Sequence, residues 1–513
     1  MQRKLFRGTV ALLVVTGAWA APTPPASAAA MIEVTQSGDG DSGPGCTLRQ
    51  AIRAANLNTS VLFCFHPGTT GPDTILVPPG TYSLSLTGSD DTAEDGDLDI
   101  TDDLTIVGAG ADRTTIDASG MGNERVFHIL AGVDATINGF TITGGTDSGF
   151  TGGGVLNVGA LTLDAVRITD NATSAAGGGI SNTGALVVRR SVIDHNIAFA
   201  GAGLQHAAGT ATLVATTVSG NSASASGGGI NSSAPGTLTH VTITDNEADR
   251  DPGDIFAGDG GGLATTGNLA LARSILAGNV DGSPGAEAPD CSGGPISQGH
   301  NVVGDDTGCS FVPQATDRVG VDAGIAPALT DNGGPTPTHA LRASSPARDL
   351  LPAGNAACGG ADQRRVPRPF GAGCDAGAYE RASCMDRIVN IVGTPGPDSL
   401  VGTSASDGVL GLAGADVVRS LGGNDRVCGG PGADTIRLGA GSDRARGDGG
   451  RDLILGGGGR DILRGNGGAD RLRGGGGSDQ LFGGPGRDGL AGGPGVDRCR
   501  QGPGSGPVSS CEA

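Results

Sequence analysis

Lysine, aromatic residues and long apolar runs are scarce in this chain of 513 residues. Lys4 is the only lysine, aromatic residues make up 3% of the chain, and 97 residues are glycine. This composition excludes a compact core of large side chains and favours short coils stacked on one another. The scarcity of lysine also excludes any lyase mechanism that needs a lysine base.

The apolar run of the chain lies near its start, at residues 10–20. It follows Arg3, Lys4 and Arg7 and precedes the small residues Ala26, Ser27 and Ala28. This pattern predicts a secretory signal peptide over residues 1–28. Because the run is too short to span a bilayer comfortably, we predict no membrane span. We expect a secreted, extracellular protein, either free or associated with the cell surface.

The negative charge is unevenly distributed. The formal net charge is −20, yet residues 385–513 carry 15 acidic residues against 14 arginines. Residues 29–384 carry 38 acidic and 16 basic residues, a net charge of −22. Because such a surface repels nucleic acid and anionic membranes, we expect neither as a partner, whereas divalent cations are attracted.

All ten cysteines follow the predicted signal peptide, and none forms a CxxC pair of the kind that binds zinc. An even number of cysteines in an exported chain predicts disulfides. Spacing alone does not determine the connectivity. Sequence proximity suggests the pairs Cys46–Cys64, Cys291–Cys309, Cys358–Cys374, Cys384–Cys428 and Cys499–Cys511.

A first internal repeat has a period of about 25 residues. Its marker is an asparagine that follows a β-rich segment, as in AVRITDN and VTITDN, and a glycine cluster opens each unit. This period is typical of one coil of a right-handed parallel β-helix, whose equivalent residues stack about 4.8 Å apart. We predict an asparagine ladder beside an inward apolar column. The ladder comprises Asn171, Asn196, Asn221, Asn246 and Asn279, and the column comprises Ile168, Ile193, Val218, Ile243 and Leu276.

The sequence on either side of these coils lacks the 25-residue repeat. CTLRQAIRAAN places Leu48, Ile52 and Ala55 on one helical face, which predicts a short helix that caps the stack. We expect the cap and first coils over residues 29–130 and the regular coils over residues 131–290. A proline-rich, disulfide-containing cap at the other end is expected over residues 291–384.

Two motifs resemble known families. CTLRQAIRAAN resembles the CSLREA-type motif of secreted bacterial β-helix proteins, with Thr47 and Gln50 as departures. GHNVVGD, DNGGPTPTHALRASSPARD, DQRRVPRP and CDAGAYE resemble the choice-of-anchor Q region that often closes such helices. Both resemblances imply a pectate-lyase-like β-helix but no particular reaction.

A second repeat has a period of nine residues and covers residues 385–500, before a tail over residues 501–513. An aspartate recurs twelve times in phase from Asp398 to Asp497, and a mostly apolar residue follows each one two positions later. Glycines precede most of these aspartates, as in GGPGAD and GGGGRD. The pattern resembles the GGxGxDxUx nonapeptide of RTX proteins, which implies a parallel β-roll with two units per coil. The predicted fold is therefore all-β, a parallel β-helix followed by an RTX β-roll.

Stacked aspartates predict calcium sites. Carboxylates brought close together repel one another, and Ca²⁺ accepts six to eight oxygen ligands in loose geometry. We expect several ions. The units of Asp407 and Asp425 depart furthest from the glycine pattern, so we expect weaker binding there. The predicted ligands are Asp398, Asp416, Asp434, Asp443, Asp452, Asp461, Asp470, Asp479, Asp488 and Asp497.

A catalytic site on the β-helix has weaker support. Asp170, Asp194, His195 and Asp245 lie just before ladder asparagines and are candidate acids and bases, with Arg167, Arg189 and Arg190 as substrate clamps. Aspartate and histidine are also common at such bends as turn formers. The sequence contains no HExxH, no GxSxG with triad partners and no Walker loop.

Two functions remain open from the sequence. The first is a non-catalytic extracellular protein that recognises a polysaccharide or a cell-surface component, with a roll that folds on binding calcium. The second is a secreted polysaccharide lyase or glycoside hydrolase that works in the β-helix groove. The charge of −22 makes an anionic polymer a poor substrate and favours the first.

Overall fold

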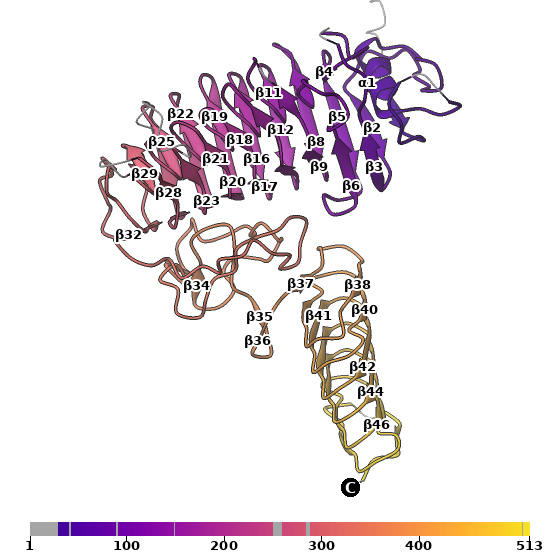
Figure 1. Cartoon of the computed structure of the whole chain (residues 1–513). Helices are drawn as coiled ribbons and strands as arrows, with labels where there is room; N and C mark the ends of the chain where they lie inside the picture. Colours follow the sequence, from indigo (N-terminus) through magenta and orange to yellow (C-terminus); the bar gives the residue numbers. More distant parts are fainter. Residues whose placement is uncertain are drawn as a thin grey trace, which may run out of the picture.

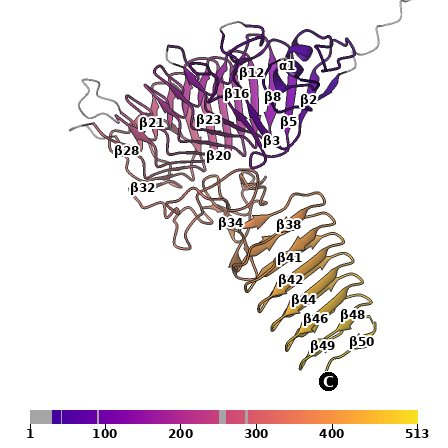
Figure 2. The same cartoon turned by 45° about the vertical axis from the view of Figure 1, so that its right-hand side comes forward.

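The computed structural model describes residues 29–40, 43–88, 91–147, 149–249, 259–283, 288–504 and 506–512. The predicted signal peptide lies outside these residues. Within them the fold is all-β apart from one helix, and the strands form two stacks joined by an irregular segment (Figures 1 and 2). The predicted fold class, a parallel β-helix followed by a parallel β-roll, is confirmed.

The longest sheet has 18 strands and consists of two parallel ladders that merge in β20 (Thr210–Ser219) and β23 (Gly236–Thr244). The first ladder also contains β1 (Met31–Glu33), β2 (Asp73–Val77), β5 (Leu104–Gly108), β8 (Asp134–Asn138), β12 (Ala160–Asp164), β16 (Ala185–Arg189), β26 (Leu269–Ala272) and β30 (Ile296–Ser297). The second also contains β3 (Gly80–Ser83), β6 (Thr114–Asp117), β9 (Thr141–Thr143), β13 (Arg167–Thr169), β17 (Val192–Asp194), β27 (Ile275–Leu276), β31 (Val302–Val303) and β32 (Arg318–Val319).

Two further parallel sheets close the coils of the β-helix. The eight-stranded sheet contains β4 (Leu98–Ile100), β7 (Phe127–Ile129), β11 (Val155–Asn157), β15 (Ile180–Asn182), β19 (Leu204–His206), β22 (Ile230–Ser232), β25 (Leu263–Thr265) and β29 (Cys291–Gly293). The six-stranded sheet contains β10 (Thr146–Asp147), β14 (Ala172–Thr173), β18 (Ile197–Ala198), β21 (Ser222–Ala223), β24 (Glu247–Ala248) and β28 (Val280–Asp281).

The predicted column and ladder both form. Ile168, Ile193 and Val218 are register partners and are at most 1% exposed. Each ladder asparagine donates from Nδ2 to Oδ1 of the next, at 2.8 to 3.0 Å. At the end of the ladder Asn279 donates to Asp290 Oδ1 at 2.8 Å, a step that the 25-residue period does not contain. Stacked amides thus satisfy buried polar groups that water cannot reach.

Helix α1 (Leu48–Asn56) packs at the start of the stack, as predicted (Figure 1). Leu48, Ile52 and Ala55 belong to the continuous core of the β-helix. Thr47 and Gln50 form a capping box, in which the Thr47 N–H donates to Gln50 Oε1 at 3.2 Å. The two departures from the family motif therefore begin the helix.

The coils continue beyond residue 290, because β29 to β32 add to the sheets. The chain then turns back as a bridging segment, residues 321–389, that lies along the long sheet instead of covering its end. Thr217 Oγ1 on β20 donates to Gln363 Oε1 at 2.7 Å, and the Ala378 N–H donates to Thr242 Oγ1 on β23 at 2.9 Å. Its regular structure is two antiparallel pairs, β33 (Leu351–Pro352) with β34 (Gly373–Cys374) and β35 (Ser383–Cys384) with β36 (Arg387–Ile388).

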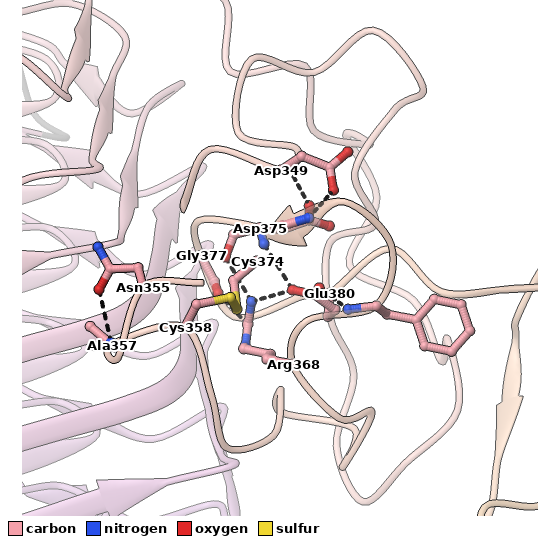
Figure 3. Close-up of a disulfide and its surroundings, with 11 residues drawn as sticks. Asp349, Asn355, Ala357, Cys358, Arg368, Cys374, Asp375, Gly377 and Glu380 are labelled. Atoms are coloured by element: carbon pink, nitrogen blue, oxygen red, sulfur yellow. Dashed lines mark hydrogen bonds and ion pairs between the residues drawn. A yellow bond between two sulfur atoms is a disulfide. The ribbon is translucent and has the colours of Figure 1, made fainter. Parts of the chain in front are cut away.

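Polar contacts and disulfides hold the bridging segment together. Arg368 is buried and donates to Glu380 Oε2 at 2.6 Å, close to the Cys358–Cys374 disulfide (Figure 3). The Cys384–Cys428 disulfide joins the segment to the roll. All five disulfides suggested by sequence proximity are present.

The roll consists of two seven-stranded parallel sheets that enclose the predicted apolar column, from Val409 to Leu490. One sheet contains β37 (Ile391–Val392), β39 (Gly408–Leu410), β41 (Arg426–Pro431), β43 (Arg444–Gly449), β45 (Ile462–Gly467), β47 (Gln480–Phe482) and β49 (Arg498–Arg500). The other contains β38 (Ser399–Val401), β40 (Val417–Arg419), β42 (Thr435–Ala440), β44 (Leu453–Gly458), β46 (Arg471–Gly476), β48 (Gly489–Ala491) and β50 (Val508–Ser509). Among the described residues, no helix has the length and apolarity needed to cross a membrane.

Candidate calcium-binding site

The repeat aspartates form a stack along each edge of the roll. As the nine-residue period predicts, each aspartate lies beside the one 18 residues away. The N–H of Asp443 donates to Oδ1 of Asp461 at 2.9 Å, and the N–H of Asp461 donates to Oδ1 of Asp479 at 2.9 Å. Asp434 and Asp452 make the same contact on the other edge, also at 2.9 Å. One carboxylate oxygen of each stacked aspartate is therefore used to connect consecutive coils.

The other carboxylate oxygen, Oδ2, is buried without a hydrogen-bond partner in ten consecutive units. A buried, unpaired carboxylate oxygen is costly, and a repeated set of them is the arrangement that a bound cation would stabilise. These ten oxygens include nine of the ten predicted ligands, together with Asp425. They belong to Asp416, Asp425, Asp434, Asp443, Asp452, Asp461, Asp470, Asp479, Asp488 and Asp497.

The first two units of the roll differ from the others. Oδ2 of Asp398 accepts hydrogen bonds from the N–H and the hydroxyl of Thr394. Oδ2 of Asp407 accepts the same two bonds from Thr403, at 2.7 and 3.0 Å. The period alone did not distinguish these units, because the difference lies in the threonine four residues earlier.

Glycine shapes the space around each free oxygen. A Cβ on Gly456 would lie 2.4 Å from Asp461 Oδ2 and 2.4 Å from the Gly474 carbonyl oxygen, so only glycine fits there. The residue four before each of the ten aspartates has positive φ, as at Gly457 with 111°. Four units have another residue at this position. Asp448 (φ 74°) and Asn466 (φ 68°) tolerate it because short polar side chains adopt the left-handed region, and the other two are Leu412 (φ 75°) and Leu421 (φ 71°).

The electrostatics of the stack favour a bound cation. Burial, followed by the neighbouring carboxylates, raises the pKa of Asp461 to about 7. Burial and nearby carboxylates likewise raise the pKa of Asp452 to about 7. The pKa values of Asp416 and Asp443 are raised to about 6, again chiefly by burial. A dication between the turns would offset the cost of ionising these groups.

The catalytic candidates on the β-helix occupy structural positions. Asp170, His195 and Asp245 each have φ between 54° and 56°, at the bend where other coils have Gly220 or Gly278. Aspartate and histidine are enriched at this backbone conformation. The turn therefore accounts for these residue types without catalysis.

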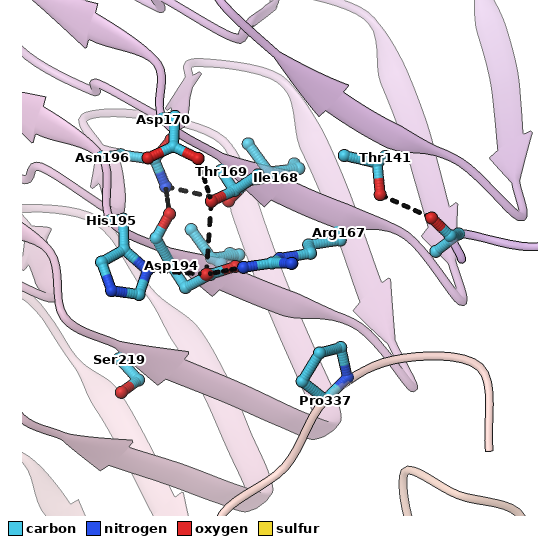
Figure 4. A network of polar contacts seen from close by, with 12 residues as sticks. Thr141, Arg167, Ile168, Thr169, Asp170, Asp194, His195, Asn196, Ser219 and Pro337 are labelled. Carbon is cyan, nitrogen blue, oxygen red and sulfur yellow. Dashed lines mark hydrogen bonds and ion pairs between the residues drawn. The ribbon is translucent and has the colours of Figure 1, made fainter. Parts of the chain in front are cut away.

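Asp194, the fourth candidate, is buried and fully engaged. Its Oδ2 lies 2.6 Å from Arg167 Nη2 and 2.8 Å from His195 Nδ1, and Oδ1 accepts from Arg167 Nε at 3.0 Å (Figure 4). These contacts hold the pKa of Asp194 below its usual value despite its burial.

The bridging segment covers part of the same face. Pro337 lies near Arg167 (Figure 4), and Ser219 Oγ on β20 lies 2.8 Å from His339 Nε2. The sequence patterns do not predict that residues 120 positions apart meet here. The structure therefore brings Arg167, Asp194 and His195 together, whereas Asp245 lies 3.8 Å from the buried His339.

Asp91, Asp99 and His128 form another group of potential ligands, which no sequence pattern predicts because its members are far apart in the sequence. Both carboxylate oxygens of Asp99 already have partners, since Oδ1 lies 3.1 Å from His128 Nδ1 and Oδ2 accepts from the Ala93 N–H at 3.2 Å. The free oxygens that distinguish the roll are therefore missing from Asp99.

Comparisons with solved structures give weak likenesses. The crystal structure of pectate lyase Pel9A is 15% identical, with a TM-score of 0.40, over 68% of this chain and 97% of that one. ORF18 of Geobacillus virus E2 is 12% identical, with a TM-score of 0.19, over 87% and 54%. The PL6 family alginate lyase AlyGC is 10% identical, with a TM-score of 0.15, over 84% and 77%. No curated protein matches the chain.

A family model matches the roll. It describes the RTX calcium-binding nonapeptide repeat in four copies, and it matches residues 392–427, 428–463 and 464–499. Residues 392–499 of this chain are therefore RTX calcium-binding repeats.

Proposed function

We propose that this protein is a secreted, extracellular calcium-binding protein whose roll folds on binding several calcium ions. The β-helix serves as a non-catalytic rod or recognition surface. The observation that carries the proposal is the set of ten buried, unpartnered Oδ2 atoms along the two edges of the roll.

The donor set suits calcium. Carboxylate oxygens and the carbonyls of glycine-rich turns are hard ligands, and Ca²⁺ accepts many of them in irregular geometry. Bound calcium would supply positive charge between neighbouring turns. The ten aspartates with free Oδ2 are the primary ligands in this proposal, while Asp398 is a terminal ligand that would have to exchange its threonine contacts for the metal.

Binding and folding are linked in this proposal. The roll buries one sizeable apolar side chain per nine residues, and its many glycines raise the entropy cost of ordering the backbone. Each site exists only when neighbouring coils are in register, so the calcium response should be cooperative.

Secretion is supported by the five disulfides and by the predicted signal peptide. The resemblances to the CSLREA and choice-of-anchor Q families stay predictions. The non-catalytic role is supported by the burial of Asp194 and by the turn conformation of the other three candidates.

The calcium proposal is tested by replacing Asp461 and Asp479 together with asparagine in the full chain. This pair leaves the middle of one edge without two carboxylates, so the calcium midpoint followed by circular dichroism should rise. The matched control, Asp386→Asn with Glu512→Gln, removes two exposed charges and should leave the midpoint unchanged. Equal midpoints in both double variants would overturn the proposal.

The non-catalytic role is tested by depolymerisation assays on acidic polysaccharides. We expect no cleavage by the wild-type protein. Cleavage that is lost in Asp194→Asn and retained in the exposed control Asp134→Asn would establish the lyase or hydrolase alternative.

A further inference from the structure

The roll separates its charges in space. Eleven of the twelve repeat aspartates are buried in the turns, and Asp398 is half-buried. By contrast, the 14 arginines of residues 385–513 are exposed or half-buried. The acids outside the repeat positions are Asp386, Asp448 and Glu512. The nearly neutral sum therefore conceals an acidic interior and an exterior covered with arginine.

Parallel register aligns arginines on the sheet that contains β41 to β49. Arg426 pairs with Arg444, and Arg446 pairs with Arg464. The Arg464 guanidinium lies 5.1 Å from the centre of the Phe482 ring, the only aromatic ring of residues 385–513. These positions repeat once per coil, about every 4.8 Å. The arginine face, as we call it, comprises Arg426, Arg444, Arg446, Arg464, Phe482, Arg498 and Arg500.

A cavity of about 480 Å³ lies at one end of the arginine face, lined by Arg387, Arg426 and Arg444. Arg387 Nη1 donates to the Ser406 carbonyl oxygen at 3.1 Å, and Arg426 Nη1 donates to the Asp425 carbonyl oxygen at 2.9 Å. Arg387 Nε is buried without a hydrogen-bond partner.

The carboxylates near this cavity form no close ion pair with its arginines, although buried Asp425 and Asp443 act electrostatically on Arg426. Among the described residues of the roll, Arg446 alone pairs with a carboxylate, that of Asp448 at 3.1 Å. Asp386 lines the cavity but lies more than 4 Å from the charged nitrogens of its three arginines. Three neighbouring cations without a paired anion attract one.

The two arginine columns, interrupted at Ile462, Gln480 and Phe482, favour a linear polyanion over a second copy of this chain. The β-helix is strongly acidic, but none of its described register pairs joins two acidic residues, so its charges do not form columns that could match the arginine columns. A linear polymer with one anionic group per repeating unit has a row of charges that can lie along the arginine columns.

The shape of the face favours a polysaccharide over nucleic acid. A duplex is cylindrical and touches a flat sheet along one line, whereas an extended polysaccharide lies flat on it. Guanidinium groups bind carboxylates in bidentate fashion, as they bind phosphates, so the flat shape of the sheet is what favours the polysaccharide.

We propose that the calcium-loaded roll binds a linear, carboxylate-bearing polysaccharide along the arginine face, with one carboxylate held by Arg387, Arg426 and Arg444. This inference rests on the proposed function, because calcium holds the coils in the register that aligns the arginines. By reciprocity, the polysaccharide raises the calcium affinity of the roll.

The test uses the full chain in saturating calcium and measures the anisotropy of a fluorescent hyaluronan oligosaccharide. The triple variant Arg444→Gln, Arg464→Gln and Arg500→Gln should bind at least about tenfold more weakly, because charge-assisted hydrogen bonds are lost. The control triple variant Arg451→Gln, Arg460→Gln and Arg487→Gln removes the same charge from exposed turns and should bind within about threefold of wild type. Arg464→Gln alone should show a smaller loss, which keeps the test valid if the triple variant misfolds.

Other outcomes overturn the proposal. Equal losses in the two triple variants would show that net charge, not the arginine face, attracts the polymer. Single-stranded DNA of equal charge that binds as tightly would replace the polysaccharide by nucleic acid, and calcium-dependent dimers that exclude the oligosaccharide would replace it by a second copy. Circular dichroism separates the two proposals, because a roll that does not respond to calcium refutes the proposed function directly.

Discussion

At the scale of single residues, the turns of the roll depend on glycine, which has no side chain, as much as on the aspartates. The glycine five positions before most of the aspartates gives the carboxylate its space, as Gly456 does for Asp461. Two residues further on, a Cβ on Gly458 would have nothing within 4 Å, so the same substitution meets open space there.

This contrast predicts opposite outcomes for two alanine substitutions. Gly456→Ala places a methyl group against Asp461 Oδ2 and the Gly474 carbonyl, so it should raise the calcium midpoint several-fold. Gly458→Ala should leave the midpoint unchanged. A calcium titration by circular dichroism checks both variants, and an unchanged midpoint in Gly456→Ala would contradict this account of the turn.

The raised pKa values predict how pH acts on the metal-free roll. Asp452 and Asp461 hold their protons up to a pKa of about 7 when folded, whereas an aspartate in an unfolded chain loses its proton near pH 3.9. Between these values the folded state binds more protons, so its stability falls as the pH rises. In calcium-free buffer the roll should therefore show more β signal at pH 5 than at pH 8.

Calcium reverses this dependence, since it must displace the protons. The calcium midpoint should be higher at pH 5 than at pH 8. A midpoint that does not change with pH would show that the carboxylates ionise freely in the turns.

At the scale of elements, most of the fold that could be predicted from the sequence was predicted from the two repeats. The 25-residue period correctly placed the ladder and the apolar column, and the nine-residue period placed Asp434 beside Asp452. The bridging segment has no period, and its contacts join distant residues such as Thr217 and Gln363. Its position on the sheet, and hence the covering of Ser219, could not be derived from local patterns.

The asparagine ladder should contribute strongly to the stability of the β-helix. Asn221 is fully buried and donates to Asn246 Oδ1 and to the Ile193 and Ser219 carbonyl oxygens. Asn221→Ala leaves these acceptors unsatisfied, so it should lower the free energy of unfolding by roughly 2–4 kcal/mol. Asn231→Ala, on the outer side of β22, should cost less than about 0.5 kcal/mol. Urea unfolding of the calcium-free protein compares the two variants. Equal losses in the free energy of unfolding would show that the ladder contributes no more to stability than an outer asparagine.

At the scale of the whole molecule, two stacks with different sources of stability share one covalent chain. The β-helix has a continuous apolar core, asparagine amides and disulfides, whereas the roll has one narrow column and unpaired carboxylates. The bridging segment contacts both, because Gln363 accepts a hydrogen bond from Thr217 on β20 and the Cys384–Cys428 disulfide joins the segment to the roll.

Removal of calcium should therefore separate the two stacks in stability. After EGTA is added to the full chain, hydrogen exchange should become fast over residues 391–500 and stay slow in the long sheet, because the ladder and the core do not depend on metal. The bridging segment should keep its protection where it bonds to Thr217 and Thr242. Calcium should restore protection of the roll, and magnesium should not, since it demands a stricter octahedral site. Fast exchange in β20 and β23 after chelation would show instead that the β-helix depends on the roll for its stability.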